Sequence, residues 1–167
     1  NDWQLTVTAT RYQLEDLKRT SIERSVVRAV VTRSNELGMQ AIYRMRSALQ
    51  RLEVKLPESV TFEAQPLRIN GRPVPLEQGA EGNYFLPLLD FEADTEFFLE
   101  LRYSMPDSVA GSGARIVLPT FPQEPAAQKT CLCVYLPREW AMLGATGPWT
   151  PEPGGDGSLG AATSPHR

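Results

Sequence analysis

The chain has 167 residues, a formal net charge of −3, 41% hydrophobic residues and 22% charged residues. This length suits one domain, and the composition is typical of a globular protein. Because the chain has no overall excess of positive charge, we expect no nucleic-acid partner. It also has no apolar run long enough for a membrane span, so we expect no direct membrane insertion by this segment. The Asn1 start without a signal-peptide pattern suggests a fragment of a larger protein.

Alternating apolar residues mark the strands of the N-terminal third. Leu5, Val7 and Ala9 predict a strand within an N-terminal extension that covers residues 1–20. After Ile22 the alternation becomes strong and rich in β-branched residues, which predicts a half-buried strand. Turn residues follow at 35–38, and the alternation from Ala41 to Leu49 then predicts a second strand.

The alternation changes phase near residues 50–51. Odd positions face inward up to Leu49, whereas the even positions Leu52, Val54 and Leu56 share a face afterwards. Either the extra residue of a β-bulge or a corner between two sheets would produce this change. Pro57 ends the segment because it cannot donate a backbone hydrogen bond to a sheet.

Further short strands are predicted in the second half of the chain. Residues 60–64 resume the alternation, and Asn70-Gly71 predicts a hairpin turn because both positions of a type I′ turn need positive φ. Residues 97–104 give the clearest half-buried strand. Residues 131–136 are apolar on both faces, which is typical of a central strand.

These patterns together predict an all-β fold. About eight to ten short strands without a long amphipathic helix favour an antiparallel β-sandwich of Ig-like or jelly-roll type. We expect the sandwich to occupy residues 1–145. Residues 146–167 are rich in Gly, Pro and Ser and predict a flexible linker or disordered tail.

The residues that support most catalytic sites are scarce. The only histidine is His166 in the predicted tail, so the folded part cannot build a Ser-His-Asp triad, a Cys-His pair or a His-ligated zinc site. A Ser-Lys or carboxylate-pair mechanism stays open. No glycine loop has phosphate-binding spacing before a helix. We therefore expect neither an enzyme active site nor a cofactor.

Two clusters could hold a cation. Cys131 and Cys133 are two apart on a predicted strand, a spacing that suits neither a disulfide between them nor a complete soft-metal site. We expect them to act as small buried apolar residues, and the sequence leaves open whether their thiols are free. The acidic run 90–96 could bind Ca²⁺ through its oxygens, but it lacks the spacing of an EF-hand loop, so a solvated turn is the preferred interpretation.

Two pairs of residues are candidates for a binding surface. Arg44 and Arg46 share one face of a predicted strand and could bind anionic glycans or phosphates, although cross-strand pairing with acidic residues is the alternative. Trp140 and Trp149 could form flat platforms for sugars, although filling of the core is the alternative.

The order of motifs between residues 20 and 137 resembles a known family. The matching pieces are YRMRS at 43–47, LQRLEVKLP at 49–57, INGRPV at 69–74, FLPL at 85–88, ELRY at 100–103 and YLP at 135–137. This series resembles the β-sandwich domain that is repeated in large, uncharacterised bacterial cell-envelope proteins. The resemblance implies a non-catalytic module outside the cytoplasm and brings no ligand residues with it.

Three functions are therefore open. The first is a non-catalytic interaction or spacer domain of a larger extracytoplasmic or membrane-associated bacterial protein, located in the periplasm or cell envelope. Its partners would be neighbouring domains of the same chain, envelope proteins or a glycan. The second is a carbohydrate-binding module, and the third is an accessory domain of an enzyme.

Overall fold

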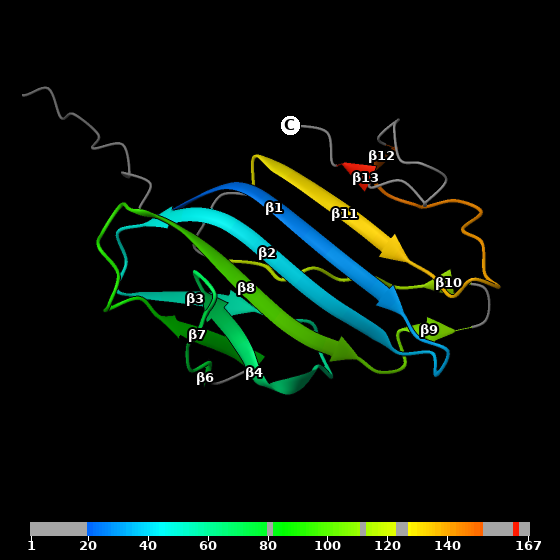
Figure 1. The fold of residues 1–167 in the computed structure, drawn as a ribbon, viewed down its shortest axis with the longest axis horizontal. Helices are drawn as coiled ribbons and strands as arrows, with labels where there is room; N and C mark the ends of the chain where they lie inside the picture. The colour runs from blue at the N-terminus through cyan, green and yellow to red at the C-terminus, as the bar shows by residue number, and fades with distance from the viewer. Residues whose placement is uncertain (1–19, 80–81, 111–112, 123–126, 152–161, 164–167) are drawn as a thin grey trace, which may run out of the picture.

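The computed structural model describes residues 20–79, 82–110, 113–122, 127–151 and 162–163 (Figure 1). For residues 151, 162 and 163 it describes the backbone only. All regular elements in these ranges are strands. They are β1 Thr20–Val31, β2 Leu37–Ser47, β3 Arg51–Lys55, β4 Thr61–Ile69, β5 Arg72–Pro73, β6 Glu77–Gln78, β7 Asn83–Pro87, β8 Glu96–Met105, β9 Val109–Ala110, β10 Gly113–Ala114, β11 Lys129–Tyr135, β12 Thr150–Pro151 and β13 Ala162–Thr163. The predicted all-β fold is confirmed.

A large sheet with the strand order β12-β13-β11-β1-β2-β8-β4-β5 forms one layer. Its long strands β1, β2 and β8 run side by side across the molecule and pair antiparallel (Figure 1). The pairing of β1 with β11 is parallel, which departs from the antiparallel sandwich that the sequence predicts. A parallel pair needs a long connection, and here every strand from β2 to β10 lies in the chain between the two partners.

A smaller sheet with the order β3-β7-β6 forms the second layer, and β9 and β10 make a separate two-stranded ribbon. The small sheet lies beneath the large sheet in Figure 1. Its Leu52, Val54 and Leu86 belong to the same buried cluster as Leu99 and Leu101 of β8. The two layers therefore share one hydrophobic core, as in a β-sandwich.

The alternation predicted for the first strands is confirmed. In β1 the odd positions from Ser25 to Val31 are buried, and in β2 the odd positions from Leu37 to Ser47 are buried. Successive side chains of a strand point to opposite faces, so the even positions form the other face of the large sheet.

The change of phase near residue 50 is a corner between sheets. β2 ends at Ser47 in the large sheet, and β3 begins at Arg51 in the small sheet. The backbone N–H of Leu88 donates to the carbonyl of Gln50 at 2.8 Å, which ties the corner to the end of β7. Of the two explanations that the sequence left open, the corner is correct.

A large bulge in β4 overturns the alternation predicted for residues 60–64. Between Phe62 and Leu67, β4 advances five residues while β8 advances two, from Tyr103 to Leu101. The extra residues leave the sheet, and Ala64 among them is exposed; Phe62, which still pairs with Tyr103, is exposed as well. The sequence prediction was wrong here because the bulge depends on the pairing with β8, which lies about 35 residues further along.

Of the other local predictions, one is confirmed and others fall outside the described residues. Asn70 and Gly71 have φ values of 50° and 80°, which confirms the predicted tight turn between β4 and β5. The predicted N-terminal strand in residues 1–19 lies outside the described residues, and so does most of the predicted tail. Of that tail, β12 and β13 are described as a short antiparallel pair, and β13 extends the large sheet beside β11.

Candidate binding surface

The face of the large sheet that points away from the small sheet is the candidate site. We call it the outer face, and it comprises the even positions of β2 and β8, the even positions of β1 from Arg24 onward, Glu23 at the irregularity of β1, and Arg68 of β4. The strand register sets its rows, one of which runs from Val26 through Ile42 and Glu100 to Arg68. Side chains that are directly opposite on neighbouring strands lie close enough to interact. The register therefore decides which of the charges on this face meet.

Arg44 and Arg46 lie together at one end of the outer face and are ion-paired. The Arg44 guanidinium lies 2.7 Å from Glu96 and 3.3 Å from Glu23, and that of Arg46 lies 3.4 Å from Glu23 and 3.7 Å from Glu96. The hydrogen bond from Arg44 holds the pKa of Glu96 below its ordinary value and, reciprocally, raises that of Arg44. This is the cross-strand pairing that the sequence offered as the alternative to anion binding. Their predicted role in binding stays a prediction.

A second polar network occupies the middle of the outer face. The Gln40 amide donates to Glu100 at 2.6 Å, and Arg102 donates to the same carboxylate oxygen at 2.7 Å. Arg28 in turn donates to the Gln40 carbonyl oxygen at 3.1 Å. Partial burial raises the pKa of Glu100, but the hydrogen bonds from Gln40 and Arg102 outweigh it, so the pKa lies below the ordinary value.

Three arginines of this face have no ion pair within the described part of the chain. The nearest polar contacts of Arg24 and Arg28 are to the Cys131 sulfur at 3.8 Å and to Gln40. The Nε atom of Arg68 is buried and has no hydrogen-bond partner among the described residues. Arg24 and Arg28 lie four residues apart on β1 and so share one face of the strand. Arg68 could not be found from sequence, because only the pairing of β4 with β8 brings it to this face.

The two tryptophans have different environments. Trp140 is 38% exposed, and its backbone N–H donates to Pro137 at 2.9 Å. Trp149 is partly buried and packs against the core, with its indole against Gly147, whose φ is 115°. They do not form a pair of exposed platforms of the kind that a sugar would need.

The cysteine pair lies on β11 at the edge of the outer face. Cys131 is buried, Cys133 is half-buried, and neither forms a disulfide. The register places Cys131 beside Val26 and Cys133 beside Arg28. The prediction of a buried apolar residue is thus confirmed for Cys131, whereas Cys133 keeps part of its surface accessible.

The described residues contain no group of three or more His, Cys, Asp or Glu side chains that could hold a metal ion. In the acidic run, Asp90, Glu92 and Asp94 are exposed, while Glu96 is occupied by Arg44. An open depression of about 370 Å³ beside the bulge of β4 is lined by residues without ionisable side chains, namely Ala64, Gln65, Pro66, Pro73, Val74, Pro75 and Leu76. It has no groups for acid–base or nucleophilic chemistry.

Two tyrosines are the ionisable side chains most deeply buried in the described core. Burial raises the pKa of Tyr43, with a smaller contribution from Tyr103, and burial also raises the pKa of Tyr103. Both hydroxyls therefore stay protonated, and Tyr43 packs edge-on against Phe121 with ring centroids 5.0 Å apart. Neither tyrosine lies on the outer face. In the described ranges no helix is long and apolar enough to cross a membrane.

Comparison with known proteins identifies the fold. No family model matches the chain, and no curated protein matches it in sequence. Among solved structures, native yeast LTA4 hydrolase matches 90% of this chain with a TM-score of 0.59 and 12% identity, over 27% of its own length. The M1 zinc metallopeptidase from Deinococcus radiodurans matches 90% of this chain with a TM-score of 0.57 and 17% identity, over 39% of its own length. The chain thus has the same fold as a part of these enzymes and spans well under half of them.

Proposed function

We propose that this chain is an accessory β domain of a larger enzyme, of the zinc metallopeptidase kind, and that it contributes structure and surface, not catalytic groups. The observation that carries the proposal is the coverage of the structural match. Nearly the whole chain is matched, yet the match takes up only 27% and 39% of the two enzymes. A fold alone does not decide function, so the proposal depends on what accompanies the domain.

The chemistry of the described residues supports an accessory role. They contain no metal-binding cluster, and the depression beside β4 has no ionisable lining. Zinc peptidases need a set of histidine and carboxylate ligands with a general base close by. In a larger enzyme those groups would belong to the remainder of the polypeptide.

The proposal replaces the spacer of a cell-envelope protein as our main interpretation, because the solved structures that match are parts of a zinc metallopeptidase and of LTA4 hydrolase. A location in the periplasm or cell envelope, with envelope proteins or a glycan as partners, remains a prediction from the sequence resemblance. An extracytoplasmic enzyme would be compatible with both.

The test is to isolate the native protein with an antibody raised against this chain. We expect a polypeptide longer than 167 residues that contains zinc and hydrolyses short peptides, with hydrolysis lost on chelation and restored by zinc. Mass spectrometry gives the length and the products. The recombinant chain alone is the control and should bind no zinc and cleave no peptide. A longer protein without zinc or hydrolysis would return the spacer interpretation to first place.

A further inference from the structure

The outer face carries an excess of positive charge on a chain whose net charge is −3. On β1, β2, β8 and the Leu67–Ile69 end of β4 it holds six arginines and three glutamates, which are Arg24, Arg28, Arg44, Arg46, Arg68, Arg102, Glu23, Glu96 and Glu100. The bulge of β4 carries one further exposed carboxylate, that of Glu63. The described strands therefore separate charge, with the outer face positive on a molecule that is negative as a whole. Such a face attracts acidic partners and orients them.

The excess comes from three arginines, because the other three are paired with the three glutamates. Arg24 and Arg28 are four residues apart on β1, and Arg68 lies three strands away in the row between them. From ordinary strand geometry the Cα atoms of these three arginines span an area of about 13 by 14 Å. An extended segment of about four or five residues would cover it.

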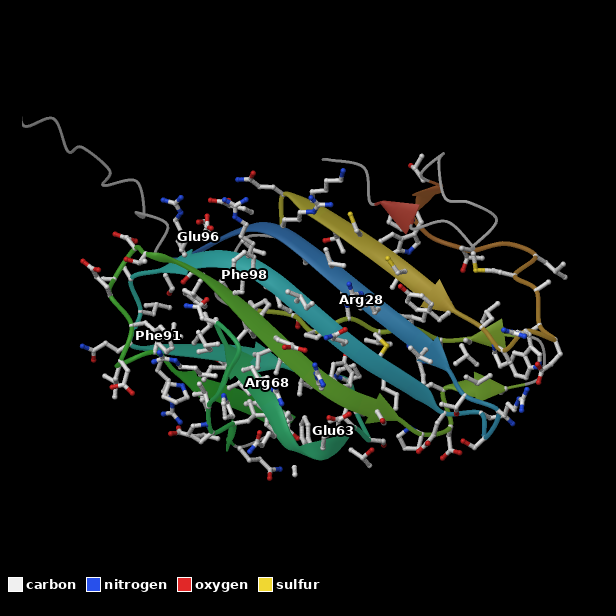
Figure 2. All side chains as sticks on the ribbon, viewed as in Figure 1. Arg28, Glu63, Arg68, Phe91, Glu96 and Phe98 are labelled. Carbon is white, nitrogen blue, oxygen red and sulfur yellow. The ribbon has the colours of Figure 1, made fainter. Side chains whose placement is uncertain are left out.

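Apolar side chains lie within this frame. Val26 and Ile42 are half-buried neighbours across β1 and β2, and Phe98 of β8 is 50% exposed in the next row (Figure 2). Arginine and aromatic residues around an apolar centre are the composition typical of protein-binding surfaces. Figure 2 labels Arg28, Arg68 and Phe98 on three different strands of the large sheet.

We propose that the outer face binds an acidic, partly apolar segment of another protein, with Arg24, Arg28 and Arg68 pairing its carboxylates and Phe98 contacting its apolar side chains. A phosphate backbone fits less well, because Glu23, Glu96 and Glu100 interrupt the positive surface and would repel a continuous polyanion. Arg68 is partly exposed, although its Nε is buried and Glu100 lies opposite it on β8. This inference does not rest on the proposed enzyme context.

The experiment measures binding of a fluorescent peptide, in which Glu alternates with Leu and Phe, to the full chain by fluorescence anisotropy. We expect the peptide to bind, and its binding to weaken as the salt concentration rises. The same peptide with Lys in place of Glu should not bind. Replacing Arg24, Arg28 and Arg68 together by Gln should weaken binding at least about tenfold. Changing three exposed arginines elsewhere, Arg72, Arg115 and Arg138, to Gln is the matched control and should change it less than about twofold.

Two further variants keep the test decisive. Arg28→Gln alone removes an exposed side chain that the fold does not need, so it reports on binding even if the Arg68 change disturbs the sheet. Phe98→Ala should also weaken the peptide while leaving the unfolding transition in place, whereas a purely electrostatic surface would not respond. Equal loss in the control triple variant would overturn the proposal.

Competing ligands decide the class of partner. Duplex DNA or heparin that binds tighter than the peptide through the same three arginines would overturn the proposal in favour of a polyanion. Sedimentation equilibrium of the chain alone tests the last alternative, which is self-association. Self-association that is lost in the triple variant, with no peptide binding, would show that the occupant is a second copy of this chain.

Discussion

Glu100 is the residue on which the middle of the outer face depends. It is partly buried, and its carboxylate accepts hydrogen bonds from Gln40 and Arg102. Because these donors favour the charged form, the pKa of Glu100 in the folded protein lies below the ordinary value of 4.5. Folding therefore lowers the pKa, which makes the stability of the protein depend on pH.

We predict that Glu100→Gln flattens the acid side of the stability curve. A carboxylate with a lowered folded-state pKa contributes stability at pH values above its unfolded pKa, and this contribution is lost as the pH falls through the folded value. The wild-type free energy of unfolding should thus fall from about pH 5 downward, and less steeply in the variant. Urea unfolding at a series of pH values measures the slope.

Two controls separate the carboxylate from its surroundings. Gln40→Ala removes one donor and should flatten the acid slope in part, because Arg102 remains in contact with Glu100. Leu89→Ala changes an exposed side chain that has no charge and should leave the slope as it is in wild type. An unchanged slope in Glu100→Gln would show that the two hydrogen bonds do not favour the charged carboxylate.

At the scale of elements, the turn between β4 and β5 depends on backbone conformation. Asn70 and Gly71 have φ values of 50° and 80°. The Asn70 side-chain oxygen accepts a hydrogen bond from the backbone N–H of Phe98 at 2.9 Å, and the backbone N–H of Asn70 donates to the Phe98 carbonyl at 2.9 Å. These two hydrogen bonds therefore fix the turn to β8 at Phe98, the exposed aromatic residue of the outer face.

Gly71→Ala should lower the free energy of unfolding by about 1 kcal/mol. A Cβ atom at Gly71 meets open space, so the cost comes from positive φ and not from a clash. Gly144→Ala is the matched control, because Gly144 also has open space around its Cβ position and its φ lies outside the left-handed region. Thermal and urea unfolding measure both variants. Equal effects at the two glycines would contradict a conformational cause.

Local patterns carried the prediction of individual strands. The alternation of β1, β2 and β8 depends on neighbouring residues only, and it correctly predicted their buried faces. The same holds for the Asn70-Gly71 turn. The change of phase at residue 50 showed that something interrupts the strand, but the sequence could not distinguish a bulge from a corner, because both shift the alternation by one residue.

The features of the fold that the sequence did not predict depend on pairing between distant residues. The parallel register of β1 with β11 joins residues about a hundred positions apart, and no local pattern specifies it. The bulge of β4 and the position of Arg68 depend in the same way on β8. For the candidate site, the spacing along one predicted strand indicated Arg44 and Arg46. The structure shows that their charges are paired, whereas Arg24 on the neighbouring strand has no ion pair in the described part of the chain.

At the scale of the whole molecule, the two sheets depend on one core. Leu86 of the small sheet and Leu101 of the large sheet are both fully buried and belong to the same cluster. A three-stranded sheet of such short strands has too little buried surface to be stable alone. We therefore expect the described domain to unfold as a single cooperative unit, so that a cavity in either layer destabilises both.

Leu86→Ala and Leu101→Ala should each lower the free energy of unfolding by about 2–5 kcal/mol, the cost of a cavity in a close-packed core. Tryptophan fluorescence and far-UV circular dichroism should report one coincident urea transition in both variants, because neither layer can lose its packing alone. Leu89→Ala, at a side chain that is 70% exposed, is the control and should change stability by less than about 0.5 kcal/mol. If Leu86→Ala splits the transition in two, the small sheet unfolds independently, and the outer face could then persist without it. The binding experiment on the Leu86→Ala variant would show directly whether the large sheet alone maintains the arginine frame.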